Sequence, residues 1–271
     1  MEIKKINGKA IYNPSGKAGE YSKWACNFYV GCSNGCTYCY CKKGILAGAM
    51  GGNVPTLKKC FKNENHALEV FEKELHANLP ELQKHGIFFS FSTDPCLEET
   101  QYLTAKAIDF CIKNKVSVKL LTKCVKPSIS LVKFGLGEMT DLFKRYVAIG
   151  LTLTGRDDLE PNASTNAERI EAMRKLHEAG FKTWASIEPI IDFDSSLEMI
   201  RQTRGFCDLY KVGLESGKKY DLWEVRSLLL ACYGMTDCKI YFKDSLLKAA
   251  GINREDLPAN CVSRDYNMFN D

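Results

Sequence analysis

The sequence predicts an α/β protein built from six or seven repeated strand–helix units that form a barrel or part of one. Short runs rich in β-branched and aromatic residues alternate along the chain with runs of helical periodicity. Polar residues follow directly where the expected strands end, and no Pro-, Gly- or Ser-rich linker divides the 271 residues. Strands that alternate with helices form parallel, right-handed βαβ units, so we expect one barrel with its polar residues at the carboxyl ends of the strands.

Seven segments have the composition of strands: 24–31, 87–92, 116–122, 146–153, 181–188, 207–214 and 238–243. Helical patterns lie between them, at 66–79, 103–115 and 219–234 among others. One further helix is expected to begin with a capping box formed by Thr165 and Glu168 and to stop at Gly180. We therefore predict a short extension at 1–20, a partial barrel at 21–250, and a tail at 251–271 on or near the barrel mouth.

The composition sets limits on the class of protein. A hydrophobic content of 45% is ample for a core, and a net charge of +4 permits an anionic partner without requiring one. The thirteen cysteines are an odd number and crowd one segment, which is typical of an intracellular protein that places thiolates on a metal. The N-terminus has no signal-peptide core and no apolar run is long enough to span a membrane. We expect a cytoplasmic protein without membrane contact.

Four cysteines lie within ten residues directly after the first expected strand: Cys32, Cys36, Cys39 and Cys41. Iron–sulfur clusters are held by thiolates, and three of them leave one iron of a cubane open to an outside molecule. The alternative is a zinc site that uses all four thiols. Zinc sites usually combine two separate pairs of ligands, so four ligands in one short loop are poor geometry for a tetrahedron.

The spacing CxxxCxxC, with the aromatic Tyr38 before the last cysteine, resembles the radical S-adenosylmethionine (radical SAM) superfamily. The resemblance implies a partial TIM barrel of (β/α)6 type. It implies a 4Fe–4S cluster on Cys32, Cys36 and Cys39, with Cys41 left out, and S-adenosylmethionine chelated at the open iron. Cleavage of that cofactor by one electron gives a 5′-deoxyadenosyl radical, which abstracts a hydrogen atom from a substrate. An electron donor such as flavodoxin or ferredoxin is implied as a partner.

The polar residues at the strand ends then become candidate cofactor contacts. Following the superfamily pattern, the second strand would bind the amino group, the third the carboxylate and the fourth the ribose, with Tyr38 beside the cofactor. The candidates are Ser92, Thr93, Asp94, Lys123, Thr152 and Thr154. A helix cap for the Ser-Thr-Asp segment and a solvated lysine are the simpler alternatives.

The fifth and sixth barrel strands also end in polar residues: Ser186, Glu188, Lys211 and Glu215. Charged groups at the ends of apolar strands are costly to bury without a partner or a role. They are candidate contacts to the substrate or the cofactor. An internal salt bridge among them is the competing explanation.

The run Tyr38-Cys39-Tyr40, with the Thr-Asp and Thr-Lys strand ends, resembles the spore photoproduct lyase branch, which includes DNA repair photolyases. The resemblance implies a lyase in which Tyr38 and Tyr40 take part in hydrogen-atom return. A nucleic-acid lesion or modified base is the implied substrate, and a peptide or small molecule is the alternative. Ser90 and Phe91 stand where the lyase has its hydrogen-donor cysteine, so repair of thymine dimers is not implied.

A second class of function is a nucleic-acid-binding module without catalysis. It would use a zinc loop and the basic residues that follow it: Lys42, Lys43, Lys58, Lys59 and Lys62. The same lysines suit an acidic electron donor or a solvated surface. The alternating strand–helix pattern argues against the module, because a binding module seldom needs so large a barrel.

Overall fold

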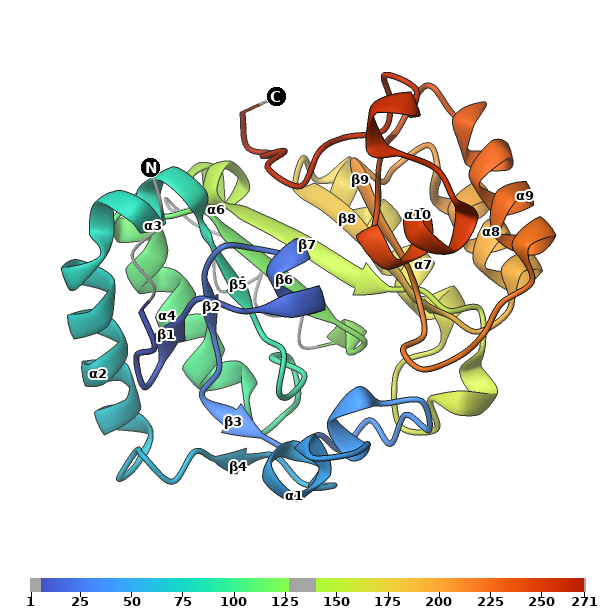
Figure 1. Cartoon of the computed structure of the whole chain (residues 1–271). Helices are drawn as coiled ribbons and strands as arrows, with labels where there is room; N and C mark the ends of the chain where they lie inside the picture. Colours follow the sequence, from blue (N-terminus) through green and yellow to red (C-terminus); the bar gives the residue numbers. More distant parts are fainter. Residues whose placement is uncertain (1–5, 127–139, 271) are drawn as a thin grey trace.

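A computed structural model describes residues 6–126 and 140–270, and these residues form a mostly parallel sheet covered by helices (Figure 1). The eight-stranded sheet has the order β1-β2-β5-β6-β7-β8-β9-β10, in which only β1 runs antiparallel to its neighbour. Its strands are β1 Ile11–Tyr12, β2 Ala25–Cys26, β5 Ile87–Phe89, β6 Val118–Thr122, β7 Val147–Thr152, β8 Lys182–Ile190, β9 Leu209–Leu214 and β10 Lys239–Phe242. The predicted α/β fold is confirmed.

The helices follow the strands as the sequence predicts. They are α1 Leu46–Met50, α2 Glu64–Ala77, α3 Leu79–His85, α4 Gln101–Lys113, α6 Thr140–Tyr146, α7 Asn166–Glu178, α8 Phe193–Thr203, α9 Leu222–Tyr233 and α10 Asp244–Ala250, with short 3-10 turns η1 Gly16–Glu20, η2 Tyr40–Lys42, η3 Asp157–Leu159 and η4 Arg254–Asp256. The capping box of Thr165 and Glu168 begins α7, as predicted. No helix in the described part of the chain has the length and hydropathy needed to cross a membrane.

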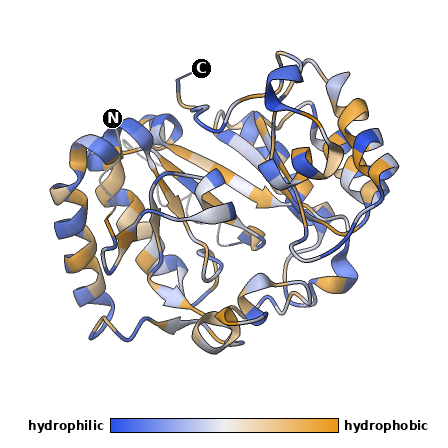
Figure 2. Ribbon diagram, viewed as in Figure 1, coloured by the Kyte–Doolittle hydropathy of each residue, from blue (hydrophilic) through white to orange (hydrophobic). Residues whose placement is uncertain are grey.

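The two faces of the sheet carry different residues because side chains alternate along each strand. Phe89, Leu120 and Ile149 point to the helices, whereas Phe88 and Trp184 belong to a separate inner cluster. Gly150 lies on the inner face directly under Trp184, and a Cβ there would stand 2.1 Å from the indole ring. Figure 2 shows β7 as a largely hydrophobic strand between these layers.

The N-terminal extension forms part of the inner face. The Lys211 ammonium donates hydrogen bonds to the carbonyls of Glu20 (2.7 Å) and Tyr21 (3.2 Å), and the Tyr241 hydroxyl donates to the Glu20 carboxylate (3.1 Å). The end of η1 and the following Tyr21 thus lie against β9 and β10, on the inner face of the sheet.

The first expected strand, 24–31, is two strands and not one. β2 belongs to the main sheet, whereas β3 Tyr29–Val30 pairs with β4 Thr56–Leu57 in a separate antiparallel pair. Asn27 lies between them. Its backbone N–H donates to the Ala10 carbonyl, and its side-chain oxygen accepts from the backbone N–H of Phe91. These polar contacts turn the chain out of the sheet toward the cysteine loop.

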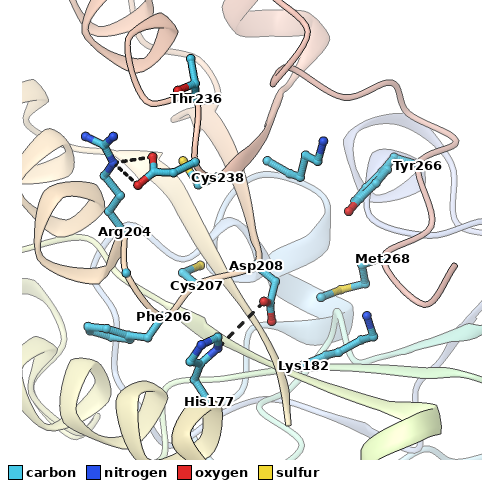
Figure 3. A pocket seen from close by; sticks show the side chains of 13 residues that line it. His177, Lys182, Arg204, Phe206, Cys207, Asp208, Thr236, Cys238, Tyr266 and Met268 are labelled. Carbon is cyan, nitrogen blue, oxygen red and sulfur yellow. Dashed lines mark hydrogen bonds and ion pairs between the residues drawn. The ribbon is translucent and has the colours of Figure 1, made fainter. Parts of the chain in front are cut away.

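The tail prediction needs a correction. Tyr266 and Met268 line a small cavity of about 270 Å³ together with Lys182 and Asp208, at the amino-terminal ends of the strands (Figure 3). Figure 1 shows the C-terminal tail at the opposite side of the molecule from α1, which follows the cysteine loop. The physical reason is burial of an apolar side chain. Met268 packs in the inner cluster at the amino-terminal end of the strands, which holds the tail there.

Candidate active site

A cavity of about 620 Å³ lies where the carboxyl ends of the parallel strands meet the cysteine loop. Its volume is in the range of small-molecule sites. Most of the residues predicted for the site line it: Cys32, Cys36, Tyr38, Cys39, Tyr40, Ser92, Thr93, Asp94, Lys123, Thr152, Ser186, Glu188 and Glu215. The structure therefore brings together residues from the cysteine loop and from five successive strands.

The cysteine loop presents all four thiols to this cavity. Burial raises the pKa of Cys32 to about 11 and also raises that of Cys36, whereas a hydrogen bond with Cys41 lowers the pKa of Cys39. Within residues 6–126 and 140–270, no three His, Cys, Asp or Glu side chains converge as ligands of a single metal ion. A cubane takes one thiolate on each of its separate irons, so the three thiols of the CxxxCxxC spacing are a donor set that fits a 4Fe–4S cluster.

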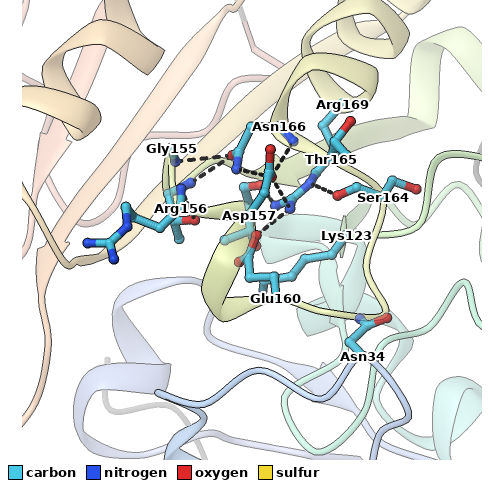
Figure 4. Close-up of polar contacts among 12 residues, drawn as sticks. Asn34, Lys123, Gly155, Arg156, Asp157, Glu160, Ser164, Thr165, Asn166 and Arg169 are labelled. Atoms are coloured by element: carbon cyan, nitrogen blue, oxygen red, sulfur yellow. Dashed lines mark hydrogen bonds and ion pairs between the residues drawn. The ribbon is translucent and has the colours of Figure 1, made fainter.

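A buried ion pair anchors the loop from behind. The Arg169 guanidinium and the Glu160 carboxylate are both fully buried and bonded to each other, and the Tyr38 hydroxyl donates to the same carboxylate. Arg169 also donates to the carbonyls of Thr152 (2.5 Å) and Ser164 (2.8 Å), as Figure 4 shows for its neighbourhood. Each buried charge therefore has a partner, which is the condition for burying charges at acceptable cost.

Backbone contacts extend this anchor along the loop. The N–H of Thr37 donates to the Leu159 carbonyl (3.0 Å), and Asn162 donates to the carbonyls of Asn34 (3.2 Å) and Ser33 (2.9 Å). We call the segment 155–165, together with Arg169, the clamp. It holds the cysteine loop against the end of β7.

Asp94 joins three elements through its carboxylate. One oxygen accepts from the Thr122 hydroxyl (2.6 Å) and the Cys96 N–H (3.0 Å), and the other accepts from the Asn34 amide (2.9 Å) and the Lys123 N–H (2.8 Å). A carboxylate has about four acceptor positions, so all of them are used inside the protein. Asp94 therefore ties strand ends to the cysteine loop and leaves no acceptor for an ammonium ligand.

Thr93 and Lys123, in the same region, keep polar groups that can contact a ligand. The Thr93 hydroxyl is buried and has no hydrogen-bond partner within the described residues. Burial alone would lower the pKa of Lys123, but the negative charge of Cys36 and Glu160 outweighs it and raises the pKa. The Lys123 ammonium lies 5.6 Å from the centre of the Tyr38 ring, so a cation stands beside the cysteine loop.

Comparison with known proteins identifies the family. Residues 26–207 match the radical SAM superfamily, which is more than half of the chain. The chain belongs to the radical SAM superfamily. As a member, it uses a 4Fe–4S cluster and S-adenosylmethionine. An uncharacterized protein of Methanocaldococcus jannaschii, MJ0683, is 30% identical over 224 residues, which are 78% of this chain and 76% of that protein.

Two solved radical SAM structures share the fold. Streptococcus suis SuiB, solved with S-adenosylmethionine, has a TM-score of 0.55 at 14% identity, over 86% of this chain and 52% of SuiB. A radical SAM methyltransferase from Sphaerobacter thermophilus has a TM-score of 0.51 at 15% identity, over 83% of this chain and 67% of that enzyme. The chain therefore spans about half the length of SuiB, and at these identities the likeness concerns the fold alone.

The radical SAM cavity is also lined by two residues that the sequence analysis missed, Tyr21 and Lys243. The Lys243 ammonium donates to both oxygens of Glu188 (2.9 and 2.8 Å). The Tyr21 hydroxyl donates to Glu188 (2.6 Å) and shares a hydrogen bond with Ser186 (2.7 Å). Lys243 is the last residue of the predicted strand 238–243 and could have been found by the strand-end rule, whereas nothing in the sequence marks Tyr21.

Glu215 closes one side of the mouth. Its carboxylate pairs with Lys43 from the cysteine loop (2.7 Å) and with Lys218 (2.5 Å). Burial alone would raise the pKa of Glu215, but the two ammonium groups lower it. Among the basic residues that follow the cluster cysteines, Lys42 and Lys43 line the cavity, whereas the Lys58 ammonium donates to the Lys9 carbonyl.

Two predicted contacts do not reach the cavity. Thr154 is fully buried and its hydroxyl accepts from the Arg156 N–H (3.3 Å). Lys211 is buried deeper on the inner face, where its ammonium donates hydrogen bonds to the carbonyls of Glu20 and Tyr21. The salt bridge considered as an alternative forms with other partners, since Glu188 pairs with Lys243.

Proposed function

We propose that the protein cleaves S-adenosylmethionine reductively at a 4Fe–4S cluster held by Cys32, Cys36 and Cys39. The observation that carries this proposal is that these thiols line one cavity together with the polar ends of five strands. When bound, the cluster and its cofactor supply a 5′-deoxyadenosyl radical, which abstracts a hydrogen atom from the substrate. The chain's own residues orient the reactants and shield them from water.

Individual roles follow from the contacts. The unpartnered Thr93 hydroxyl provides an acceptor for the amino group, and the Lys123 ammonium pairs with the carboxylate. Thr152 and Ser186 offer hydroxyls on the ribose side of the cavity, with Ser186 already bonded to Tyr21. Tyr38 is held in place by the clamp and presents its ring to Lys123.

We further propose that the substrate is a modified nucleobase or nucleic-acid lesion and that the reaction is lyase-like. The support is the tyrosine pair around Cys39. Tyr40 lines the cavity with half of its surface exposed, so it is the more accessible of the two for hydrogen-atom return, and its hydroxyl donates to the Phe91 carbonyl. The hydroxyl of Tyr38 is taken by Glu160. A peptide or another small molecule is the alternative substrate.

Radical SAM enzymes need a one-electron reductant. We propose a small cytoplasmic donor such as flavodoxin or ferredoxin, which are acidic proteins that the lysines around the mouth can attract. Lys42 and Lys43 lie next to the cluster loop and line the same cavity.

The test is anaerobic reconstitution followed by reduction in the presence of S-adenosylmethionine. The proposal predicts a brown protein with about four irons per chain and release of 5′-deoxyadenosine and methionine. Cys36→Ala is expected to abolish cluster binding and the release of 5′-deoxyadenosine, whereas Cys60→Ala, outside the loop, leaves both properties unchanged. A colourless protein with one zinc per chain and salt-dependent nucleic-acid binding that survives iron chelation would support the non-catalytic module instead.

A further inference from the structure

An apolar surface lies exposed beside the cysteine loop. Helix α1 follows the 3-10 turn η2, lies at the edge of the molecule (Figure 1), and has no buried residue. Nine large hydrophobic side chains are exposed among the described residues, and four of them fall between positions 40 and 54. Ile45 is 99% exposed, Val54 64% and Leu46 39%. Scattered apolar side chains are ordinary on a surface, but such a concentration marks a place that another molecule covers.

A small substrate inside the cavity would not cover this surface. Leu46 and Met50 line the cavity, whereas Ile45 and Val54 do not. Ile45 and Val54 therefore stay in contact with water when the cavity is filled. The molecule that covers them is a macromolecule that approaches from outside. We call Ile45, Leu46 and Val54 the docking face.

The docking face is joined to the cysteine loop through the backbone. The N–H of Cys32 donates to the Gly52 carbonyl (3.0 Å). Gly31, directly before Cys32, has a φ of +82°, and a Cβ there would stand 2.5 Å from the Val54 carbonyl oxygen. Glycine permits this close approach because it has no side chain. The path from Val54 to a cluster ligand therefore runs through Asn53, Gly52 and one hydrogen bond.

The charge around the docking face is positive. Residues 21–63 contain six lysines and neither aspartate nor glutamate. The Lys42 ammonium donates to the Asn53 side chain (2.7 Å) and forms no ion pair with any carboxylate that the structure describes. A basic rim around an aliphatic centre complements a protein that carries carboxylates around an apolar contact of its own. Nucleic-acid phosphates would pair with the lysines but would leave the aliphatic centre unmatched.

We propose that the docking face binds an acidic one-electron donor protein, with an aliphatic contact at the centre and lysines at the rim. This inference rests on the proposed function and deepens it, because it gives the reductant a surface and a contact chemistry. One electron leaves the donor, which is oxidised, and enters the cluster, which is reduced; no atom or proton moves. Electron transfer slows steeply with distance, so a donor seated beside Cys32 is better placed than one seated elsewhere on the molecule.

The first measurement is of binding without turnover. The cluster-loaded protein, without reductant, is titrated calorimetrically with oxidised flavodoxin and with oxidised ferredoxin. Ile45→Asp places a carboxylate at the centre of the contact and is expected to weaken binding at least tenfold. The matched control is Leu230→Asp on α9, where the leucine is 63% exposed, and its Kd is expected to equal that of the wild type. Raising the ionic strength from about 0.1 M to about 1 M shortens the screening length from about 10 Å to about 3 Å and is expected to weaken binding without abolishing it.

The second measurement compares two reductants in the release of 5′-deoxyadenosine. With the reduced donor protein, below its Kd, Ile45→Asp is expected to be about tenfold slower than the wild type. With dithionite, a small reductant that does not dock, the two proteins are expected to release it equally fast.

The outcomes separate this inference from the proposed function. Absence of release from the wild type with dithionite would mean that the proposed function fails. Release with dithionite, but with no binding of either donor or with donor-driven rates that Ile45→Asp leaves unchanged, would overturn this inference alone. Loss in Ile45→Asp of binding to anionic phospholipid vesicles, or of a dimer in ultracentrifugation, with unchanged donor-driven rates would also overturn it and would assign the face to a membrane or to a second copy.

Discussion

Removing Arg169 perturbs the clamp at its centre. Arg169→Met deletes the partner of a buried carboxylate and the donors to two backbone carbonyls, while it keeps an unbranched apolar side chain in place. Breaking a buried ion pair by removing one partner costs about 3–5 kcal/mol. We therefore expect the free energy of unfolding to fall by about that amount.

Urea unfolding of the reduced apoprotein, followed by circular dichroism, measures this loss. With a slope of about 3 kcal/mol per molar, the midpoint moves down by roughly 1–2 M. The control is Arg156→Met in the same segment, which removes an exposed ion pair with Asp158 and is expected to leave the midpoint unchanged. An Arg169→Met protein that unfolds at the wild-type midpoint would refute the reasoning.

A double variant separates the effect of the clamp on folding stability from its effect on the position of the cysteine loop. Arg169→Met/Glu160→Leu removes both charges, so most of the stability returns, because an apolar pair can replace a buried ion pair at little cost. The Tyr38 hydroxyl then has lost its acceptor. We expect the reconstituted cluster to be lost to an iron chelator faster than from the wild type. An unchanged rate would show that the clamp supports the fold but does not hold the loop.

Three further predictions concern other parts of the core and cavity. Thr93→Val removes an unpaired buried hydroxyl, so the apoprotein is expected to be slightly more stable, while S-adenosylmethionine binds about tenfold more weakly in equilibrium dialysis; equal affinity would exclude the proposed contact. Gly150→Ala places a methyl group in the buried Trp184 ring and is expected to cost about 1–3 kcal/mol or to prevent folding, and a thermal midpoint equal to that of the wild type would contradict the packing. Burial lowers the pKa of Lys119 to about 8. An unfolded lysine titrates near about 10.4, so between these values the unfolded state binds more protons and stability rises with pH. Lys119→Met is therefore expected to be more stable than the wild type at pH 7, with a difference that shrinks as the pH rises above 8, and a constant difference would show that Lys119 is not the titrating group.

Local signals in the sequence were sufficient for the strands from β5 onward, the capped helix α7 and the cysteine loop, but not for the division of residues 24–31 into β2 and β3. Strand-end positions identified most of the cavity because parallel strands bring their carboxyl ends to one edge. This strand-end rule fails for a residue that lies inside a strand and not at its end, because its side chain then does not reach the cavity. Lys211, inside β9, lies below the cavity, whereas Lys243, just after β10, lines it.

The clamp and the contacts of Tyr21 and Lys243 with Glu188 join segments that are far apart in the sequence. Arg169 lies on a helix with many charged residues, so its sequence neighbourhood resembles a solvated surface. Only the packing of residues 155–165 on the cysteine loop makes it a buried partner of Glu160. Tyr21 and Met268 are likewise placed by the curvature of the sheet, which periodicity does not encode.

The measurement that tests the central claim most directly is electron–nuclear double resonance of the reduced cluster with isotope-labelled S-adenosylmethionine. The account predicts coupling between the cluster and the labelled amino nitrogen and carboxylate oxygen, in the wild type and equally in Cys41→Ser. That result would mean that three thiolates hold the cubane and its remaining iron is open. Absence of coupling, together with loss of the cluster in Cys41→Ser, would mean that Cys41 is the fourth ligand and would contradict the account.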